Sequence, residues 1–324
     1  MRGGAKGVVI GAPGPFSPFS DVPFLPAPPG WGLSGAARYA SGIRRVLHGM
    51  PLTGIEVHNR PEIALRLAMP GVPMMLWLNN DPQHMRQART PADRARIARH
   101  MHVVTASKWL RDRFQDGLPP TAVTVIPNCL EPLPAPPTSR ENLIVFAGRV
   151  VADKGADAFV AACARALPGL PGWSAEMVGA DRFSPNAPDT PFLTALRPAA
   201  AAAGVMLRGH QPHDAVLDAM RRAAIVVVPS RWPEPFGLVA LEAMACGAAL
   251  ICSPRGGLPE VGGNVALYAE PESDALAIAI RTLANDPVRR AAMARAGVVR
   301  AQEFGVDRAV AALVQLRRMG VEPL

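Results

Sequence analysis

The chain has 324 residues, of which 49% are hydrophobic, and a formal net charge of +8. This length is too great for one small core and suits two domains of about 150 residues each. No stretch approaches the roughly 20 apolar residues of a membrane span, and no signal-peptide core follows the first Met, so we expect a cytoplasmic protein, soluble or peripheral on the inner face of the membrane.

Positive charge is concentrated in the first part of the chain. Residues 1–137 contain 15 Lys and Arg against 8 Asp and Glu, whereas residues 138–324 contain 19 against 18. This excess indicates an anionic partner. Because the chain has only two Tyr and no dense basic run, an anionic membrane surface fits better than nucleic acid. The four cysteines form no CxxC pair, which predicts reduced, mostly buried thiols.

Short apolar strands alternate with helices along residues 1–137. Ser34 and Ser107 are typical helix caps, Pro61 suits a first helical turn, and the Pro-rich and Gly-rich residues 16–32 should form a loop. Strands are expected at 7–12, 55–58, 73–78, 101–105 and 122–126, and helices at 35–49, 61–68, 91–100 and 108–114. Residues 131–140 contain four prolines and predict a semi-stiff linker between domains 1–137 and 138–324.

The second part of the chain repeats the alternation more regularly. Strands are expected at 143–147, 175–178, 205–208, 225–228, 249–252 and 266–268, and helices at 157–167, 191–203, 214–223, 238–245, 274–284, 287–302 and 306–318. Such alternation predicts a parallel sheet covered on both faces. The predicted fold class is α/β, with two doubly wound Rossmann-like domains facing a central cleft. The last helix is a candidate to pack back on the first domain.

A cationic loop follows the first strand of the second domain. It runs from Gly148 to Gly155 and includes Arg149 and Lys154 just before a helix N-terminus, which itself favours anions. Arg149 can grip a phosphate with two hydrogen bonds, and Lys154 adds a mobile point charge. The spacing is neither a P-loop nor GxGxxG, so a solvated turn with two surface cations is the alternative.

Two carboxylates, Glu234 and Glu242, stand eight residues apart. On one helix this spacing would be about 12 Å, which is too far for a shared proton and argues against a glycosidase-like acid/base pair. They suit two separate hydrogen-bond acceptors, each for the hydroxyl groups of a sugar. Glu242 lies in an apolar helical run and needs a partner. The alternative for Glu242 is a structural ion pair with an Arg.

These motifs resemble a known family. Residues 234–247, Glu-Pro-Phe-Gly-Leu-Val-Ala-Leu-Glu-Ala-Met-Ala-Cys-Gly, with Gly256-Gly257-Leu-Pro-Glu260 after them, resemble the E-x7-E segment of retaining glycosyltransferase family 4, whose members have the GT-B fold. The loop at 148–155 resembles the family's diphosphate loop. The resemblance covers the second half of the chain continuously and the first half more loosely.

The resemblance implies a role for each matching residue. Arg149 and Lys154 would hold the diphosphate of a donor, Glu242 the ribose hydroxyls, and Glu234 the donor sugar. Backbone N–H groups of Phe236, Gly237 and Leu238 would face the sugar and phosphate, and Gly179, Arg208 and Gly209 would lie near the base. The family needs neither metal nor cofactor, in agreement with the lack of a DxD pair. The donor phosphate would accept the proton of the attacking hydroxyl.

Two segments of the first half resemble bacterial cell-surface polysaccharide and lipopolysaccharide-core members of the family. They are Val-His-Asn-Arg-Pro at 57–61 and Leu-Asn-Asn-Asp-Pro at 78–82. Asn79 stands where those members have His, and Asn cannot carry a proton at neutral pH. If the family uses this position as a base, the chain would lack that base. If the position only orients the sugar, Asn79 can still do so through hydrogen bonds. His58 is either structural or catalytic.

Three functions are compatible with these residues. The first is a retaining transfer of a hexose from a UDP- or GDP-sugar to a glycan or lipid-linked acceptor in cell-surface polysaccharide synthesis. The second is a catalytically weak GT-B module that binds a nucleotide sugar or a partner, suggested by Asn79 and a short first domain. The third is another GT-B enzyme, such as an epimerase or a phosphorylase, which the scarcity of lysines makes the weakest.

Overall fold

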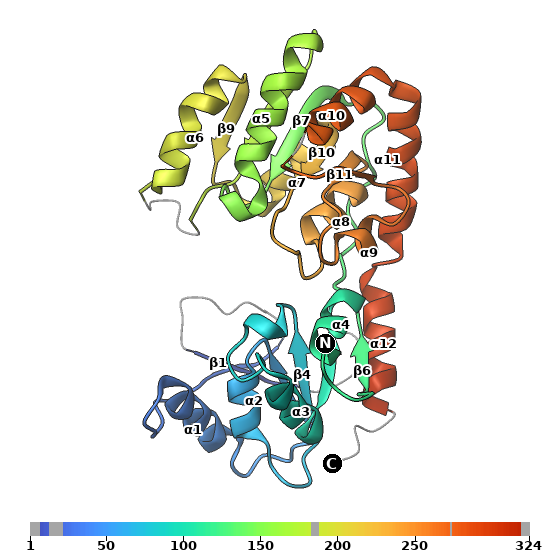
Figure 1. Cartoon of the computed structure of the whole chain (residues 1–324). Coiled ribbons are helices and arrows are strands. Elements are labelled where there is room, and N and C mark those ends of the chain that lie inside the picture. The colour runs from blue at the N-terminus through green and yellow to red at the C-terminus, as the bar shows by residue number, and fades with distance from the viewer. Residues whose placement is uncertain (1–6, 13–21, 183–187, 273, 319–324) are drawn as a thin grey trace. The chain divides into compact units, whose positions relative to one another are not determined.

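The computed structural model describes residues 7–12, 22–182, 188–272 and 274–318. The chain divides into two compact units (Figure 1). One unit comprises Met1–Pro127 together with Asp307–Leu324, and the other comprises Asn128–Val306. The polypeptide therefore passes twice from one unit to the other.

The second unit contains a six-stranded parallel sheet in the order β12-β11-β10-β7-β8-β9. Its strands are β7 (Glu141–Ala147), β8 (Ser174–Val178), β9 (Val205–Gly209), β10 (Ala223–Val228), β11 (Ala249–Cys252) and β12 (Leu267–Tyr268). Its helices are α5 (Ala156–Ala166), α6 (Pro191–Ala202), α7 (His213–Arg222), α8 (Leu238–Ala245), α9 (Leu258–Gly262), α10 (Ala275–Asn285) and α11 (Pro287–Gln302), with short 3-10 turns η2 (Ala152–Lys154) and η3 (Leu167–Gly169).

The sheet of this unit is covered on both faces, as the near-continuous apolar strands predict. Helices α5, α6 and α10 pack over one face around Ile144, Phe159 and Ile225, all of which are fully buried. Helices α7 and α8 contact strands β7 and β10 from the other side, and α11 packs on α8. The four cysteines are free, and three of them are buried.

The first unit contains a four-stranded parallel sheet in the order β3-β4-β5-β6 and a separate parallel pair, β1-β2. Its strands are β1 (Val9–Gly11), β2 (Phe24–Pro26), β3 (Ile55–His58), β4 (Met74–Leu78), β5 (His102–Thr105) and β6 (Val123–Val125). Its helices are α1 (Gly35–Leu47), α2 (Pro61–Leu67), the 3-10 turn η1 (Pro82–His84), α3 (Pro91–His100), α4 (Lys108–Gln115) and α12 (Val306–Arg318).

Strand β2 corrects the expectation that residues 16–32 form only a loop, of which residues 16–21 lie outside the described part. Phe24, Leu25 and Pro26 pair in parallel with Val9, Ile10 and Gly11. Three residues that end in Pro are too short for a period-2 pattern to show in the sequence. The pairing also depends on a partner strand that is distant along the chain.

The Pro-rich segment expected to be a linker is bound to the second unit. Arg221 donates hydrogen bonds to the carbonyl oxygens of Pro134 and Ala135. Arg140 donates to the carbonyl oxygen of Cys246 over 2.7 Å. The contact-defined second unit consequently starts at Asn128, before the boundary expected after residue 137.

Helix α12 packs on the sheet of the first unit. Leu316 is buried together with Met75, Val104 and Ile126, and Arg317 forms an ion pair with Glu56. Its apolar positions therefore cover one face of β4 and β5. Within the described residues, no helix is both long and apolar enough to cross a membrane.

Candidate functional site

The strand order of the second unit identifies where a ligand site is built. From β7 the chain proceeds outward to β8 and β9, then returns to β10 on the other side of β7 and proceeds to β11 and β12. In open α/β sheets, ligands bind outside the carboxyl ends of the strands where this reversal occurs. The loops that leave β7 and β10 at this point are residues 148–155 and 229–237.

The two loops meet in an ion pair. Lys154 Nζ donates to Glu234 Oε1 over 2.5 Å, and Ser230 Oγ donates to the same oxygen over 2.8 Å. Glu234 is only 9% exposed, and Ser230 is fully buried. A carboxylate with so little contact with water requires such partners. The geometry therefore joins two predicted site residues that sequence reasoning had treated separately.

Arg231 anchors the turn that carries Lys154. Its guanidinium binds Asp157 with two hydrogen bonds of 2.6 and 3.0 Å and donates to the carbonyl oxygen of Ala152. The backbone N–H groups of Arg231 and Trp232 both donate to the carbonyl oxygen of Asp153. These contacts fix the position of the Lys154 ammonium relative to Glu234.

Two glycines allow these loops to approach closely. Gly155 has a φ of +70°, and a Cβ there would lie 1.9 Å from the carbonyl oxygen of Pro229. Gly256 has a φ of +62°, and a Cβ would lie 2.3 Å from the carbonyl oxygen of Glu234. A side chain at either position would displace the Glu234 loop, because L-residues rarely adopt this conformation and the neighbouring atoms are backbone.

Three helices at this edge begin on a glycine without a side-chain cap. Helices α5, α8 and α9 begin after Gly155, Gly237 and Gly257, and none of these N-termini receives a side-chain hydrogen bond. The N-termini of α5 and α8 leave first-turn backbone donors available and carry partial positive charge, which suits an anion. At α9, by contrast, Leu258 N–H donates to Arg255, Glu260 N–H donates to Gly257, and Pro259 has no N–H. The predicted donors lie at the start of α8, where Phe236 is buried and Leu238 is 42% exposed.

Glu242 lies on α8, and the basic side chain beside it is a histidine, which is charged only when protonated, in place of the arginine considered above. His213 Nε2, at the start of α7, lies 3.7 Å from Glu242 Oε1. Burial raises the pKa of the Glu242 carboxyl, and the charge of His213 opposes this shift. The side chain keeps 13% of its surface exposed, so a ligand hydroxyl can reach it.

Other predicted site residues lie at the ends of neighbouring strands. Gly148 N–H donates to the carbonyl oxygen of Val178, and Gly179 N–H donates to that of Gly209 over 2.9 Å. Arg149 is exposed directly after Gly148. These bonds align the carboxyl ends of β7, β8 and β9 beside the Lys154 turn.

Arg208 has a structural partner within the sheet. It donates to Glu176 Oε1 over 2.5 Å, and Arg222 lies 3.3 Å from the other carboxylate oxygen. These bonds lower the pKa of the Glu176 carboxyl, against the effect of burial. Arg208, which the resemblance placed near the base, uses its guanidinium to hold the buried carboxylate of Glu176.

His58 and Asn79 belong to the first unit, at the ends of adjacent strands. The His58 ring stacks on Trp77 with centroids 5.5 Å apart, and loss of water around the ring lowers the pKa of His58 while Glu56 acts to raise it. Asn79 N–H donates to Asn59 Oδ1 over 2.7 Å. Asn59, at a φ of +52°, therefore ties the ends of β3 and β4 together.

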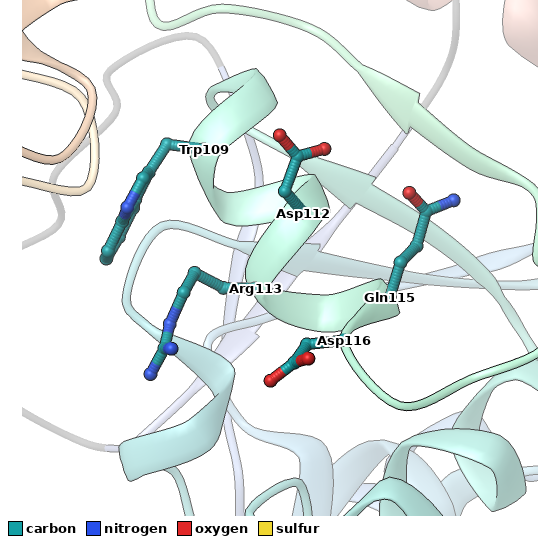
Figure 2. A pocket seen from close by; sticks show the side chains of 5 residues that line it. All are labelled: Trp109, Asp112, Arg113, Gln115 and Asp116. Carbon is teal, nitrogen blue, oxygen red and sulfur yellow. The ribbon is translucent and has the colours of Figure 1, made fainter.

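A hollow of about 560 Å³ lies on α4 of the first unit, and none of the predicted site residues lines it. Figure 2 shows the Trp109 and Arg113 side chains on one side of the helix, and the guanidinium lies 5.9 Å from the Trp109 ring centroid. Asp112, Gln115 and Asp116 complete the lining. The hollow is open and formed mainly by one helix, so it lacks the convergent groups of a ligand site.

Sequence reasoning missed three polar groups of the second unit. They are Ser230, Arg231 and His213, none of which was among the predicted site residues. Arg231 and His213 contact Asp157 and Glu242 in other segments, so no spacing within one segment reveals them, whereas Ser230 binds Glu234 within the same loop. Among the residues with described positions, no group of three or more His, Cys, Asp or Glu side chains is placed to hold a metal ion.

Comparison with known proteins agrees with this architecture. The chain resembles Anabaena HepE in complex with UDP, with a TM-score of 0.75 and 19% identity over 92% of this chain and 87% of that one. It also resembles a sucrose-phosphate synthase from Thermosynechococcus elongatus, with a TM-score of 0.73 and 20% identity over 91% and 82% of the two chains. The predicted α/β fold of GT-B type is confirmed.

The sequence itself defines the family. The profile described as "Glycosyl transferases group 1" matches residues 134–299, and the chain belongs to this family. It is 36% identical over 169 residues to the D-inositol 3-phosphate glycosyltransferase of Segniliparus rotundus, covering 51% of this chain and 37% of that protein. It is 27% identical over 213 residues to the lipopolysaccharide 1,2-N-acetylglucosaminetransferase of Salmonella typhimurium, covering 57% and 56%. The matches thus span about a third to a half of these relatives.

Proposed function

We propose that the protein is a glycosyltransferase that takes a hexose from a nucleoside diphosphate sugar bound by the second unit. The main support for this proposal is the pair of Lys154 and Glu234 at the sheet reversal, where the N-termini of α5 and α8 lack side-chain caps. Cations and free backbone donors suit a diphosphate, and carboxylates suit the hydroxyl groups of sugar and ribose. A nucleoside diphosphate sugar contains both a diphosphate and sugar hydroxyl groups.

The predicted residues of the two loops and of α8 have the following roles in this proposal. Lys154 and Arg149 hold the diphosphate, together with the N–H groups at Phe236, Gly237 and Leu238. Glu242 accepts hydrogen bonds from ribose hydroxyls, and Glu234 from the sugar. UDP as the nucleotide is supported by the UDP complex of the similar Anabaena protein, and GDP remains the alternative to be tested beside it.

We place the transfer in the retaining, metal-free class. The acceptor oxygen forms its bond to the anomeric carbon as the bond from that carbon to the phosphate oxygen breaks, on the same face of the sugar. The hydroxyl proton passes to the departing phosphate oxygen. Lys154, Arg149 and the start of α8 stabilise the negative charge that develops there.

The acceptor is proposed to be a glycan or a lipid-linked sugar of cell-surface polysaccharide synthesis. The matching Salmonella enzyme is named for lipopolysaccharide, and the segments around His58 and Asn79 resemble such enzymes. In this proposal Asn79 orients the sugar through its amide and does not carry a proton. Donor binding without turnover of any acceptor would favour the catalytically weak module.

Calorimetry with UDP and GDP tests the donor site. Lys154→Gln keeps a hydrogen-bond donor for Glu234 but removes the charge, so we expect at least about tenfold weaker nucleotide binding, roughly 1.4 kcal/mol. Arg165→Ala is the control, since Arg165 lies at the other end of α5 in an exposed ion pair with Asp274. Wild-type affinity of Lys154→Gln for both nucleotides would remove Lys154 from the site.

We further propose that the first unit contacts an anionic membrane through residues 29–45. Trp31 is 84% exposed and Leu33 is fully exposed. Arg38 and Arg45 donate to carbonyl oxygens of the same segment, Gly32 and Pro29, and no Asp or Glu occurs between residues 21 and 56. Exposed apolar side chains beside arginines that form no ion pair with a described residue suit a lipid surface of negative charge.

A further inference from the structure

Arg300, near the end of α11, braces the short helix α9. Its Nη2 donates to the carbonyl oxygen of Glu260 over 2.7 Å, and its Nε donates to that of Val261 over 3.3 Å. These carbonyls belong to the last residues of α9, which have no partner within the helix. The guanidinium therefore supplies the C-terminal hydrogen bonds of a helix that is only five residues long.

The same guanidinium also supports an aromatic pair. It lies 5.1 Å from the ring centroid of Phe304, and Phe304 packs edge-on against Phe236 with centroids 5.7 Å apart. Edge-to-face rings and a cation over a ring face are both attractive. Phe236 is buried and directly precedes Gly237, where α8 begins.

The contacts of Arg300 with α9 and with Phe304 both lead to the loop of residues 234–237. The N-terminal side of α9 returns to this loop through Gly257, whose N–H donates to the carbonyl oxygen of Glu234 over 2.6 Å. The aromatic branch reaches Phe236, two residues further along. A single side chain thus holds residues 234–237 from two sides, although Arg300 lies outside every motif recognised in the sequence.

We propose that Arg300 is a positioning residue for donor binding, acting through α9 and through Phe304 on residues 234–237. This inference rests on the proposed function, because those residues carry Glu234 and the N–H groups assigned to the donor. Arg300 does not touch the donor. Its loss leaves the contacting groups present but loosely placed, so donor affinity falls while the acceptor site is unaffected.

The chain offers a matched control on the same helix. Arg290 donates to the carbonyl oxygens of Leu283 and Ala284 at the end of α10, over 2.6 and 3.0 Å. It lies 5.1 Å from the ring centroid of Trp173. Arg290 therefore makes the same two kinds of contact as Arg300 without any to the donor loops.

The experiment compares Arg300→Ala with Arg290→Ala in the whole chain. Similar losses in thermal unfolding temperature are expected, but only Arg300→Ala should bind UDP about tenfold more weakly and raise KM for the donor, with KM for the acceptor unchanged. Arg300→Lys should recover only part of the affinity, because an ammonium can bond one carbonyl but does not stack as a planar guanidinium does. Phe304→Leu tests the aromatic branch alone if Arg300→Ala does not fold.

Hydrogen exchange without ligand separates this inference from the proposed function. Faster exchange at residues 234–240 in Arg300→Ala than in Arg290→Ala supports the bracing role even if wild type binds no nucleotide. Equal exchange in the two variants overturns it, as does wild-type UDP affinity in Arg300→Ala. Failure of the wild-type chain to bind UDP and GDP overturns the donor assignment itself.

Discussion

Burial and ligand binding favour opposite charge states of the Glu242 carboxyl. This carboxyl has a raised pKa because burial disfavours the charge, and His213 compensates only in part. The folded chain therefore binds a proton at Glu242 more readily than the unfolded chain does. Stability from this group decreases as pH rises through that pKa, whereas a ribose hydroxyl would require the ionised form.

We predict opposite effects of Glu242→Gln on stability and binding. At neutral pH the variant should unfold at an equal or higher temperature, because an unfavourable buried charge is removed. Its affinity for UDP should nevertheless fall about tenfold, an effect of roughly 1.4 kcal/mol. Differential scanning calorimetry and titration calorimetry measure the two quantities.

The pH dependence gives a second check on Glu242. Nucleotide affinity of the wild type should weaken as pH falls through a value above the ordinary glutamate range, since protons then compete with the hydroxyl. This dependence should be absent in Glu242→Gln and retained in Glu141→Gln, which alters an exposed glutamate of the same unit. An unchanged pH profile in Glu242→Gln would contradict the ribose role.

At the scale of elements, α12 is held by a small apolar contact. Leu316 is 4% exposed and packs with Met75, Val104 and Ile126. Leu316→Ala should destabilise the first unit by about 2–5 kcal/mol, the usual range for a buried leucine, without changing UDP affinity. Val299→Ala, at a 64% exposed position of α11, should change stability by no more than about 0.5 kcal/mol.

Denaturant titration measures the free energy of unfolding of Leu316→Ala, and calorimetry measures its affinity for UDP. A Leu316→Ala chain with wild-type stability would show that the α12 contact contributes little. A fall in UDP affinity would instead show that the packing of α12 affects the second unit.

Helix and strand positions were largely predictable because apolar runs in this chain are bounded by clear turn and cap residues. Helices α3, α8, α11 and α12 have the bounds expected from sequence, and Thr90 caps α3 through a reciprocal pair with Asp93. Helix α9 was missed, because five residues cannot show a helical period. Strand β2 was missed because its pairing is non-local.

The candidate site was predictable only where its residues fall within one segment. Glu234 and the Lys154 loop were visible as motifs because each follows an apolar strand and lies close to a glycine, and Glu242 was visible because it is a charged residue in an apolar helical run. The pairing of Glu234 with Lys154 was not visible, because it depends on β7 and β10 being neighbours in the sheet. The same physical reason hid His213 and Arg300, which act from other elements.

At the scale of the whole molecule, the uneven charge leads to a test with lipid vesicles. The chain should sediment with vesicles containing phosphatidylglycerol at low salt and be released as salt rises, because screening weakens each arginine contribution of about 1 kcal/mol. Replacing Trp31 and Leu33 by Ala should weaken the binding severalfold. Replacing Val288 and Val299, exposed on α11, should not.

Vesicles of phosphatidylcholine alone should bind little of the chain at any salt concentration. Equal binding to neutral and anionic vesicles would contradict an electrostatic contact. Unchanged binding after loss of Trp31 and Leu33 would show that residues 29–45 are not the contact surface.

The glycine starts of α5, α8 and α9 have a consequence for how this protein can evolve. A side-chain cap stabilises a helix by about 1 kcal/mol, and these three helices begin without one. A capping side chain cannot be added there without strain, because Gly155 and Gly237 have positive φ and a Cβ at Gly155 or Gly257 would lie within 3 Å of backbone atoms. Thermostable descendants that keep the activity should therefore have gained their stability elsewhere, in cores, loops and surface ion pairs.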